Sequence, residues 1–218
     1  MTSPRERISL PMTEPTLKNS AIEYAGYWFK TERNLVAGLS SDDRASRLRA
    51  LQRATGYFKI ARNMPRAYDV GSGHERMAPA LAILEPLRSK RVSEASLGQV
   101  VESLRHEIGA AYGGRDLLSA ATKFLWLLHS ETAVIYDSRV RRALGTPYAD
   151  YDAYLARWRA GYARCDEAIR CTCTGLPSQA VSLSSGSTVS DGEIEGIVAQ
   201  EWFRRRVYDI YLWRRGAP

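Results

Sequence analysis

The 218-residue sequence is short of cysteine and of long apolar stretches. Its three cysteines, Cys165, Cys171 and Cys173, leave an odd thiol however they pair, which is untypical of a disulfide-stabilised secreted protein. No run of about 18 apolar residues is found, and no apolar signal segment stands at the N-terminus. We therefore expect a reduced, intracellular protein of the cytoplasm that has no membrane span.

The cysteines also fail to predict a metal site. Their spacing, C-x5-C-x-C, fits none of the common zinc patterns. All three histidines precede the cysteines, so no histidine follows to supply a fourth ligand. We expect small thiols near the end of a helix, no metal and no cofactor.

Lysine is scarce in a chain that is nevertheless basic. Lys and Arg together number 31 against 24 Asp and Glu, which gives a net charge of +7. Arginine supplies most of this charge, and its planar guanidinium binds phosphate through two parallel hydrogen bonds. The balance suits a polyanionic partner such as DNA. A genomic bias toward arginine explains the same composition without a function.

Strand patterns are scarce as well, and the best one, AVIY at 133–136, is too short to build a sheet. Elsewhere apolar residues recur at helical spacing, which predicts an all-α fold and a single helical unit over residues 1–218. The Ser- and Gly-rich segment 174–191 is predicted to be a flexible loop, and the glycine-containing segment 66–77 a second loop. The helices are predicted at about 22–35, 43–64, 75–90, 93–113, 115–129, 138–145, 149–172 and 193–215.

The centre of the chain has the most informative order of elements. A helix that Ser93 can cap ends at the pair Gly113–Gly114, and a second helix follows closely. This is a helix-hairpin-helix in outline, and we place its core at residues 94–145. After the apolar run 133–136, Asp137 directly precedes the helix SRVRRALG. Asp137 is predicted to cap that helix, a role that does not exclude catalysis.

This order resembles the core of the helix-hairpin-helix DNA glycosylases, which include endonuclease III, the adenine glycosylase that acts opposite oxidised guanine, and the 8-oxoguanine glycosylases. The resemblance implies a helical fold, which can form two helical subdomains around a cleft. It implies a DNA partner as well. It also implies that Asp137 assists departure of a damaged base. In the family, an aspartate at this position stabilises positive charge on the sugar or orients the attacking nucleophile.

Two departures from the family pattern bear on the chemistry. The family hairpin separates its two glycines by one residue, whereas Gly113 and Gly114 are adjacent. Bifunctional members carry a lysine at the spacing that falls on Ser119 here, and a serine there is similar to the monofunctional adenine glycosylase. Lys123 lies one helical turn later on a similar face, so it can substitute for that lysine, or it can snorkel from a buried helix. An iron–sulfur cluster is not expected, because it needs four cysteines.

Phosphate contacts are assigned to the hairpin and to the arginines near Asp137. Hairpin N–H groups and guanidinium groups are suited to hold the backbone of distorted DNA. Each arginine can equally lie on a solvated helix face or pair with a nearby acid, as we expect of Arg204–Arg206 with Glu201 and Asp209. The five tryptophans are assigned to the core, with one or two available to stack on a base. The DNA-binding candidates are Gly113, Gly114, Arg115, Arg139, Arg141 and Arg142.

Two hypotheses of different classes follow from these patterns. The first is a base-excising DNA N-glycosylase with Asp137, Ser119 and Lys123 as catalytic candidates. The second is a non-catalytic helical module that keeps the hairpin and binds nucleic acid or a protein. A helical protein with no nucleic-acid role is a third possibility. The enzyme needs a pocket beside Asp137, whereas the module needs only the helix cap.

Overall fold

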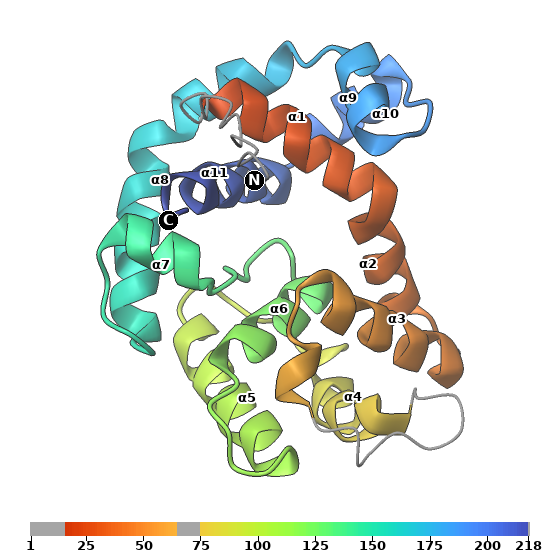
Figure 1. Cartoon of the computed structure of the whole chain (residues 1–218), viewed down its shortest axis with the longest axis vertical. Coiled ribbons are helices and arrows are strands. Elements are labelled where there is room, and N and C mark those ends of the chain that lie inside the picture. The colour runs from red at the N-terminus through yellow and green to blue at the C-terminus, as the bar shows by residue number, and fades with distance from the viewer. Residues whose placement is uncertain (1–15, 65–74, 218) are drawn as a thin grey trace, which may run out of the picture.

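The computed structural model describes residues 16–64 and 75–217, and within these ranges it is helical, without a strand (Figure 1). The prediction of an all-α fold is therefore confirmed. Most of the predicted loop 66–77 lies outside the described residues. The helices are α1 Leu17–Tyr27, α2 Arg33–Ser40, α3 Arg44–Tyr57, α4 Ala78–Leu84, α5 Leu97–Ala111, α6 Leu118–Leu128, α7 Ser138–Leu144, α8 Tyr151–Thr174, α9 Ser178–Ser185, α10 Asp191–Val198 and α11 Glu201–Arg215.

The helices form two groups that lie one above the other in Figure 1. The lower group contains α3, α4, α5 and α6, and the upper group contains α1 and α7 to α11. The chain passes between them through α2, which packs against α3 and α6, and again through the segment between α6 and α7. Residues from both groups surround the candidate site.

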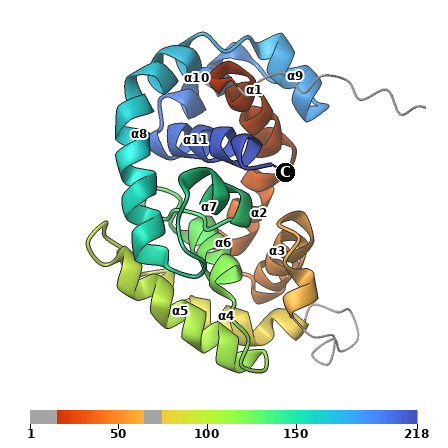
Figure 2. The same ribbon diagram turned by 60° about the vertical axis from the view of Figure 1, so that its left-hand side comes forward.

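Helix α11 is the centre of the upper group, as its wide apolar arc predicts. It packs against α1, α7 and α8, and Figures 1 and 2 show it between α8 and α1. The prediction of one helix over 193–215 is wrong, because the chain breaks at Ala199–Gln200 between α10 and α11. The Arg204 guanidinium donates to the carbonyls of Val198 (3.2 Å) and Ala199 (2.8 Å), so it satisfies acceptors that the end of α10 leaves free.

The segment 174–191 contains a helix, so the prediction of a flexible loop is wrong over Ser178–Ser185. Helix α9 packs against α1, and its Val181 side chain is fully buried. The two helices approach closely at Gly26, where an added Cβ atom would overlap Ser184. Contact with α1, rather than the propensity of the serine-rich sequence, stabilises this helix.

Helix α5 begins later than its sequence suggests. The predicted cap, Ser93, lies in a turn with Ser96, and their hydroxyl groups are 3.0 Å apart. The helix starts at Leu97, with Ser96 before it and no side-chain cap. Its predicted apolar stripe is buried at Leu97, Val101, Leu104 and Ile108.

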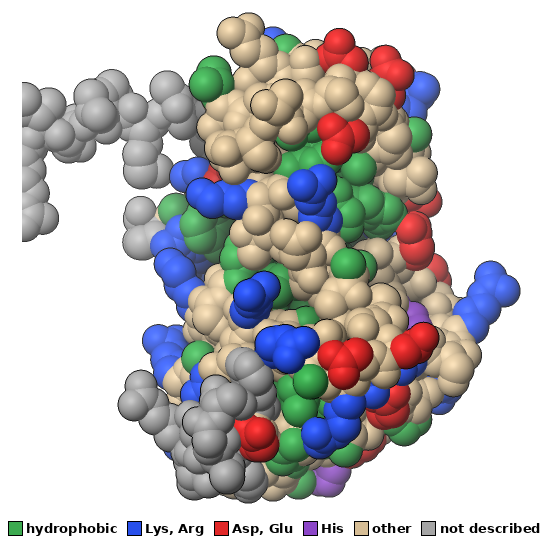
Figure 3. Space-filling view, turned by 90° about the vertical axis from the view of Figure 1, so that its right-hand side faces the viewer, with side chains coloured by type: hydrophobic (Ala, Val, Ile, Leu, Met, Phe, Trp, Pro, Cys, Tyr) green, Lys and Arg blue, Asp and Glu red, His purple; other side chains and the backbone are tan. Residues whose placement is uncertain are grey.

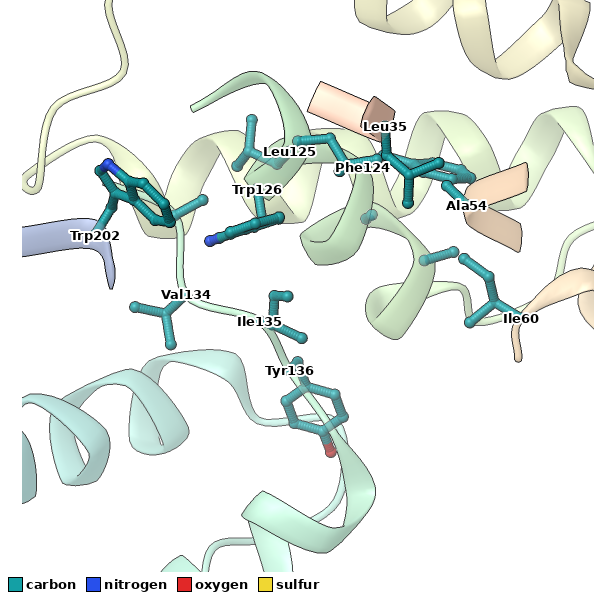
Figure 4. Packing of buried hydrophobic residues seen from close by; sticks show 14 of the residues in the cluster. Leu35, Ala54, Ile60, Phe124, Leu125, Trp126, Val134, Ile135, Tyr136 and Trp202 are labelled. Carbon is teal, nitrogen blue, oxygen red and sulfur yellow. The ribbon is translucent and has the colours of Figure 1, made fainter. Parts of the chain in front are cut away.

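The core runs along α6, whose residues from Ala120 to Leu127 are all buried. The extended segment 133–136 passes beside this helix, and Figure 4 shows its Val134 and Ile135 near Trp126, with Tyr136 farther along the segment. Trp126, Trp158 and Trp202 are buried, as predicted for core tryptophans, whereas Trp28 and Trp213 are only partly buried. The short apolar run is therefore a single buried strand-like segment without a partner strand in the described chain.

The surface mixes both signs of charge. On the face that lies to the right in Figure 1, basic side chains occupy the left and middle, and acidic ones lie mainly toward the top and right (Figure 3). None of the described helices is long and apolar enough to cross a membrane.

Candidate active site

Asp137 stands at the end of the buried segment 133–136, whose position is fixed by hydroxyl groups of neighbouring helices. A buried extended segment without a partner strand must satisfy its backbone polar groups in another way. Here three side-chain hydroxyl groups make the hydrogen bonds that a neighbouring strand would otherwise make. They hold in place the backbone that leads to Asp137. The Tyr136 N–H donates to Thr122 Oγ1 (3.0 Å), Tyr151 Oη to the Val134 carbonyl (2.9 Å), and Tyr154 Oη to the Ile135 carbonyl (2.6 Å).

Asp137 caps α7, as predicted. Its backbone is extended, and its Oδ1 atom accepts a hydrogen bond from the Arg139 N–H at 2.9 Å. The other oxygen, Oδ2, lies 3.6 Å from Lys123 Nζ. The Asp137 side chain remains 25% exposed, so one carboxylate oxygen stays accessible while the other caps the helix.

Lys123 brings its amine to the two other predicted catalytic residues. Helical side chains lean toward the N-terminus, so the Lys123 amine reaches back one turn and donates to Ser119 Oγ at 2.8 Å. The Lys123 side chain is only 7% exposed. Burial lowers the pKa of Lys123, and the nearby Asp137 carboxylate opposes that shift. Asp137, Ser119 and Lys123 thus form one cluster.

A pocket of about 580 Å³ opens beside this cluster. Its volume falls within the roughly 300–1,000 Å³ range of small-molecule sites. Its wall combines α1, the turn after α3, the start of α6, the residues around Asp137 and α11. The aromatic residues that line it are Tyr27, Tyr57, Phe58, Tyr136, Tyr148 and Trp213.

A buried charge network forms another part of the wall. Arg206 donates to Glu32 Oε1 and to Asp209 Oδ2, each at 3.0 Å. Tyr57 Oη also donates to Glu32 Oε1 (2.9 Å), and Trp158 Nε1 donates to Asp209 Oδ1 (2.6 Å). The shared Arg206 guanidinium offsets part of the desolvation penalty of the two buried carboxylates.

Sequence reasoning gave Asp209 and Glu201 as possible acidic partners of the cluster Arg204–Arg206, but assigned none of these residues to the site. It missed Glu32, which is fully buried at the end of a π-helical turn, Trp28–Glu32, between α1 and α2. Such turns are frequent at functional sites. Glu32 and Arg206 are 174 positions apart, so no local pattern could join them.

The predicted phosphate-binding arginines divide into two kinds. Arg141 and Arg142 donate to backbone carbonyls of the chain itself, at Thr146 (2.8 Å) and Gly216 (3.0 Å). Arg139 lines the pocket, and its guanidinium lies 4.1 Å from the centre of the Trp213 ring. Arg115 is exposed beside the glycine pair. Arg139 and Arg115 are therefore better placed than the other two for a ligand.

The two glycines end α5 in the left-handed region, with φ of 88° at Gly113 and 75° at Gly114. Their N–H groups donate to the carbonyls of Ala110 (3.4 Å) and Gly109 (2.8 Å). These N–H groups, which we predicted to hold phosphate, thus already cap the helix.

Comparison with known proteins gives no assignment: no family model matches the chain, and no curated protein or solved structure matches it either.

Proposed function

We propose that this protein is a helix-hairpin-helix DNA N-glycosylase that removes a damaged or modified base. The observation that carries the proposal is the Asp137–Lys123 pair beside an aromatic-lined pocket of about 580 Å³. The order of α5, a glycine turn, α6, a buried extended segment and Asp137 supports it, because it is the order of the family core.

In the proposed reaction, a nucleotide leaves the duplex stack and its base enters the pocket, at a cost of a few kcal/mol. The glycosidic bond between C1′ and the base breaks, and positive charge develops on the sugar. The Asp137 carboxylate, held in place by the Arg139 N–H, stabilises that charge.

Lys123 is assigned as the nucleophile. Its amine ends beside Ser119 Oγ, and so reaches the place where bifunctional relatives carry their lysine. Burial favours the neutral amine, which is the form that attacks. The nitrogen lone pair forms a bond to C1′, while the electron pair of the glycosidic bond leaves with the base. The ammonium nitrogen formed in this way loses a proton, and the departing base takes one up.

The alternative, a non-catalytic module, also needs Asp137 as a cap. It gives no reason for a buried lysine beside that carboxylate, or for a pocket that borders both. The enzyme hypothesis uses all three features.

The test is base release from duplexes that each carry one modified base, detected as strand breaks after alkali. Asp137→Asn is expected to reduce release by about 100-fold. The asparagine oxygen can still cap α7, so the variant should fold.

Asp150→Asn is the matched control. Asp150 caps α8 in the same way, accepting from the Ala153 N–H at 2.9 Å, but it does not line the pocket. This variant should release the base at the wild-type rate. The proposal is wrong if no duplex in the panel loses a base, or if Asp137→Asn is as active as the wild type.

A further inference from the structure

Tyr148 is unusual in its exposure. Among the described residues, the large hydrophobic side chains that are exposed are those of Tyr148 (74%) and Leu183 (80%). Leu183 lies on α9 away from the pocket, whereas Tyr148 lines the pocket that contains Asp137 and Lys123. An aromatic ring thus stands largely in solvent at the edge of an aromatic-lined pocket.

The backbone on both sides of Tyr148 is firmly held. On the N-terminal side, the Thr146 carbonyl accepts from Arg141 Nη1 (2.8 Å), and the Thr146 N–H donates to the Arg141 carbonyl (3.2 Å). On the C-terminal side, the Ala149 carbonyl accepts from Arg105 Nη1 at 3.1 Å. The ring is therefore presented from a fixed loop rather than from a loose one.

The loop is also tied to the catalytic cluster through Tyr136. The Ala149 N–H donates to Tyr136 Oη at 3.0 Å, and Tyr136 directly precedes Asp137. Ala149 has a φ of 59°, which is unfavourable for a residue other than glycine and persists because these bonds hold it there. Strain of this kind clusters at ligand sites. The hydrogen bonds that maintain it here fix the backbone of Tyr148 relative to Asp137.

We propose that Tyr148 stacks on the base of the extruded nucleotide and covers it at the mouth of the pocket. The inference rests on the proposed glycosylase function and adds a substrate-positioning residue to it. A base offers a flat face to an aromatic ring whatever its edge substituents are, so Tyr148 would hold the base without selecting it.

The experiment measures binding of two labelled duplexes by fluorescence anisotropy, in an Asp137→Asn background so that no substrate is consumed. One duplex carries the base that the wild type releases, and the other carries tetrahydrofuran, an abasic analogue, at the same position. Tyr148→Ala is expected to weaken binding of the first duplex about tenfold and to leave the second unchanged. Tyr148→Phe keeps the ring and should bind both duplexes as the parent does.

Leu183→Ala is the control for loss of an exposed apolar side chain, and it should change neither affinity. Thermal melting should show that Tyr148→Ala folds, since three-quarters of the side chain is already in solvent. The stacking role would be overturned if Tyr148→Ala weakened binding of both duplexes equally or of neither. It would also be overturned if Tyr148→Leu, which keeps an apolar side chain without a ring, bound as the parent does. Base release by the wild type would still stand in each case. If the wild type releases no base, both proposals fall.

Discussion

The two carboxylate oxygens of Asp137 have different partners. The residue can therefore cap α7 with one oxygen and still present the other to the pocket. Oδ1 accepts from the Arg139 N–H and fixes the start of α7, while Oδ2 faces the Lys123 amine. The sequence was sufficient to predict this residue, because a cap after an apolar run is a local pattern. It also indicated that Ser119 and Lys123 lie on a similar face of one helix, and Lys123 Nζ does donate to Ser119 Oγ. Their catalytic roles stay predictions.

Sodium borohydride trapping tests the role of Lys123. Attack by its amine on C1′, followed by opening of the sugar ring, gives an imine that borohydride reduces to a stable covalent adduct with DNA. The wild type is expected to be trapped, Ser119→Ala to be trapped as well, and Lys123→Gln to give no adduct. Base release without any trapped wild-type adduct would assign the attack to water, as in the monofunctional glycosylases.

Asp209 predicts a pH dependence of stability. Burial raises the pKa of Asp209 to about 6, against the opposing effects of Arg206 and Trp158. Because the ordinary pKa is 3.8, the folded state binds more protons than the unfolded state between about pH 4 and pH 6. The contribution of Asp209 to the unfolding free energy is therefore present below pH 4 and is lost as the pH rises through 6.

Urea unfolding of the wild type and of Asp209→Asn at pH 4, 5, 6 and 7 measures this contribution. Between pH 4 and pH 6 the unfolding free energy of the wild type should fall relative to the variant, by roughly 2 to 3 kcal/mol. A difference between the two proteins that is constant or grows with pH would show that the Asp209 pKa is not raised.

At the scale of single elements, sequence was a good guide where the apolar stripe is strong. The stripe of α5 and the continuous burial of α6 correspond to their patterns. Sequence failed for α9, whose serines compete for backbone hydrogen bonds and weaken the helical signal. It failed again at Ala199–Gln200, where the Arg204 side chain donates to the carbonyls of Val198 and Ala199.

Alanine substitution of two helical glycines is expected to change the unfolding free energy in opposite directions, because only one of them lies at a close helix contact. An alanine at Gly26 would overlap Ser184 and push α9 away from α1, so Gly26→Ala should lower the unfolding free energy by about 1–3 kcal/mol. Gly196 lies in α10, and an added Cβ there meets nothing within 4 Å.

Gly196→Ala should therefore raise the unfolding free energy by up to about 1 kcal/mol, through helix propensity alone. Thermal and urea unfolding of the two variants measure both effects. A neutral Gly26→Ala would mean that α9 moves freely on α1.

For the whole molecule, the pocket is a product of topology. Its wall includes Tyr27 of α1 and Trp213 of α11, which no sequence motif connects. Local patterns could predict Asp137, but not whether a pocket opens beside it. The same holds for Arg141, whose bond to the Thr146 carbonyl in the loop of Tyr148 no local pattern indicates. Its predicted DNA contact stays a prediction.

The net charge of +7 predicts a salt-dependent affinity for duplex DNA. If about three to five phosphates are contacted, the logarithm of the binding constant should fall with the logarithm of salt concentration with a slope of about −3 to −5. Arg115→Ala, at the exposed residue after the glycine pair, should reduce the slope by about one. Lys90→Ala should leave the slope unchanged, because Lys90 belongs neither to the glycine turn nor to the pocket wall. An affinity that does not respond to salt contradicts phosphate binding.

The pairing of Glu32 with Arg206 has a consequence for protein synthesis. The two residues are separated by 174 positions, which a ribosome covers in roughly 10 to 35 seconds. During that time the Glu32 carboxylate lacks the guanidinium with which it pairs in the folded protein, and it is favoured to stay in water. The final packing around Glu32, and the pocket that α11 helps to line, therefore form only once α11 has been made.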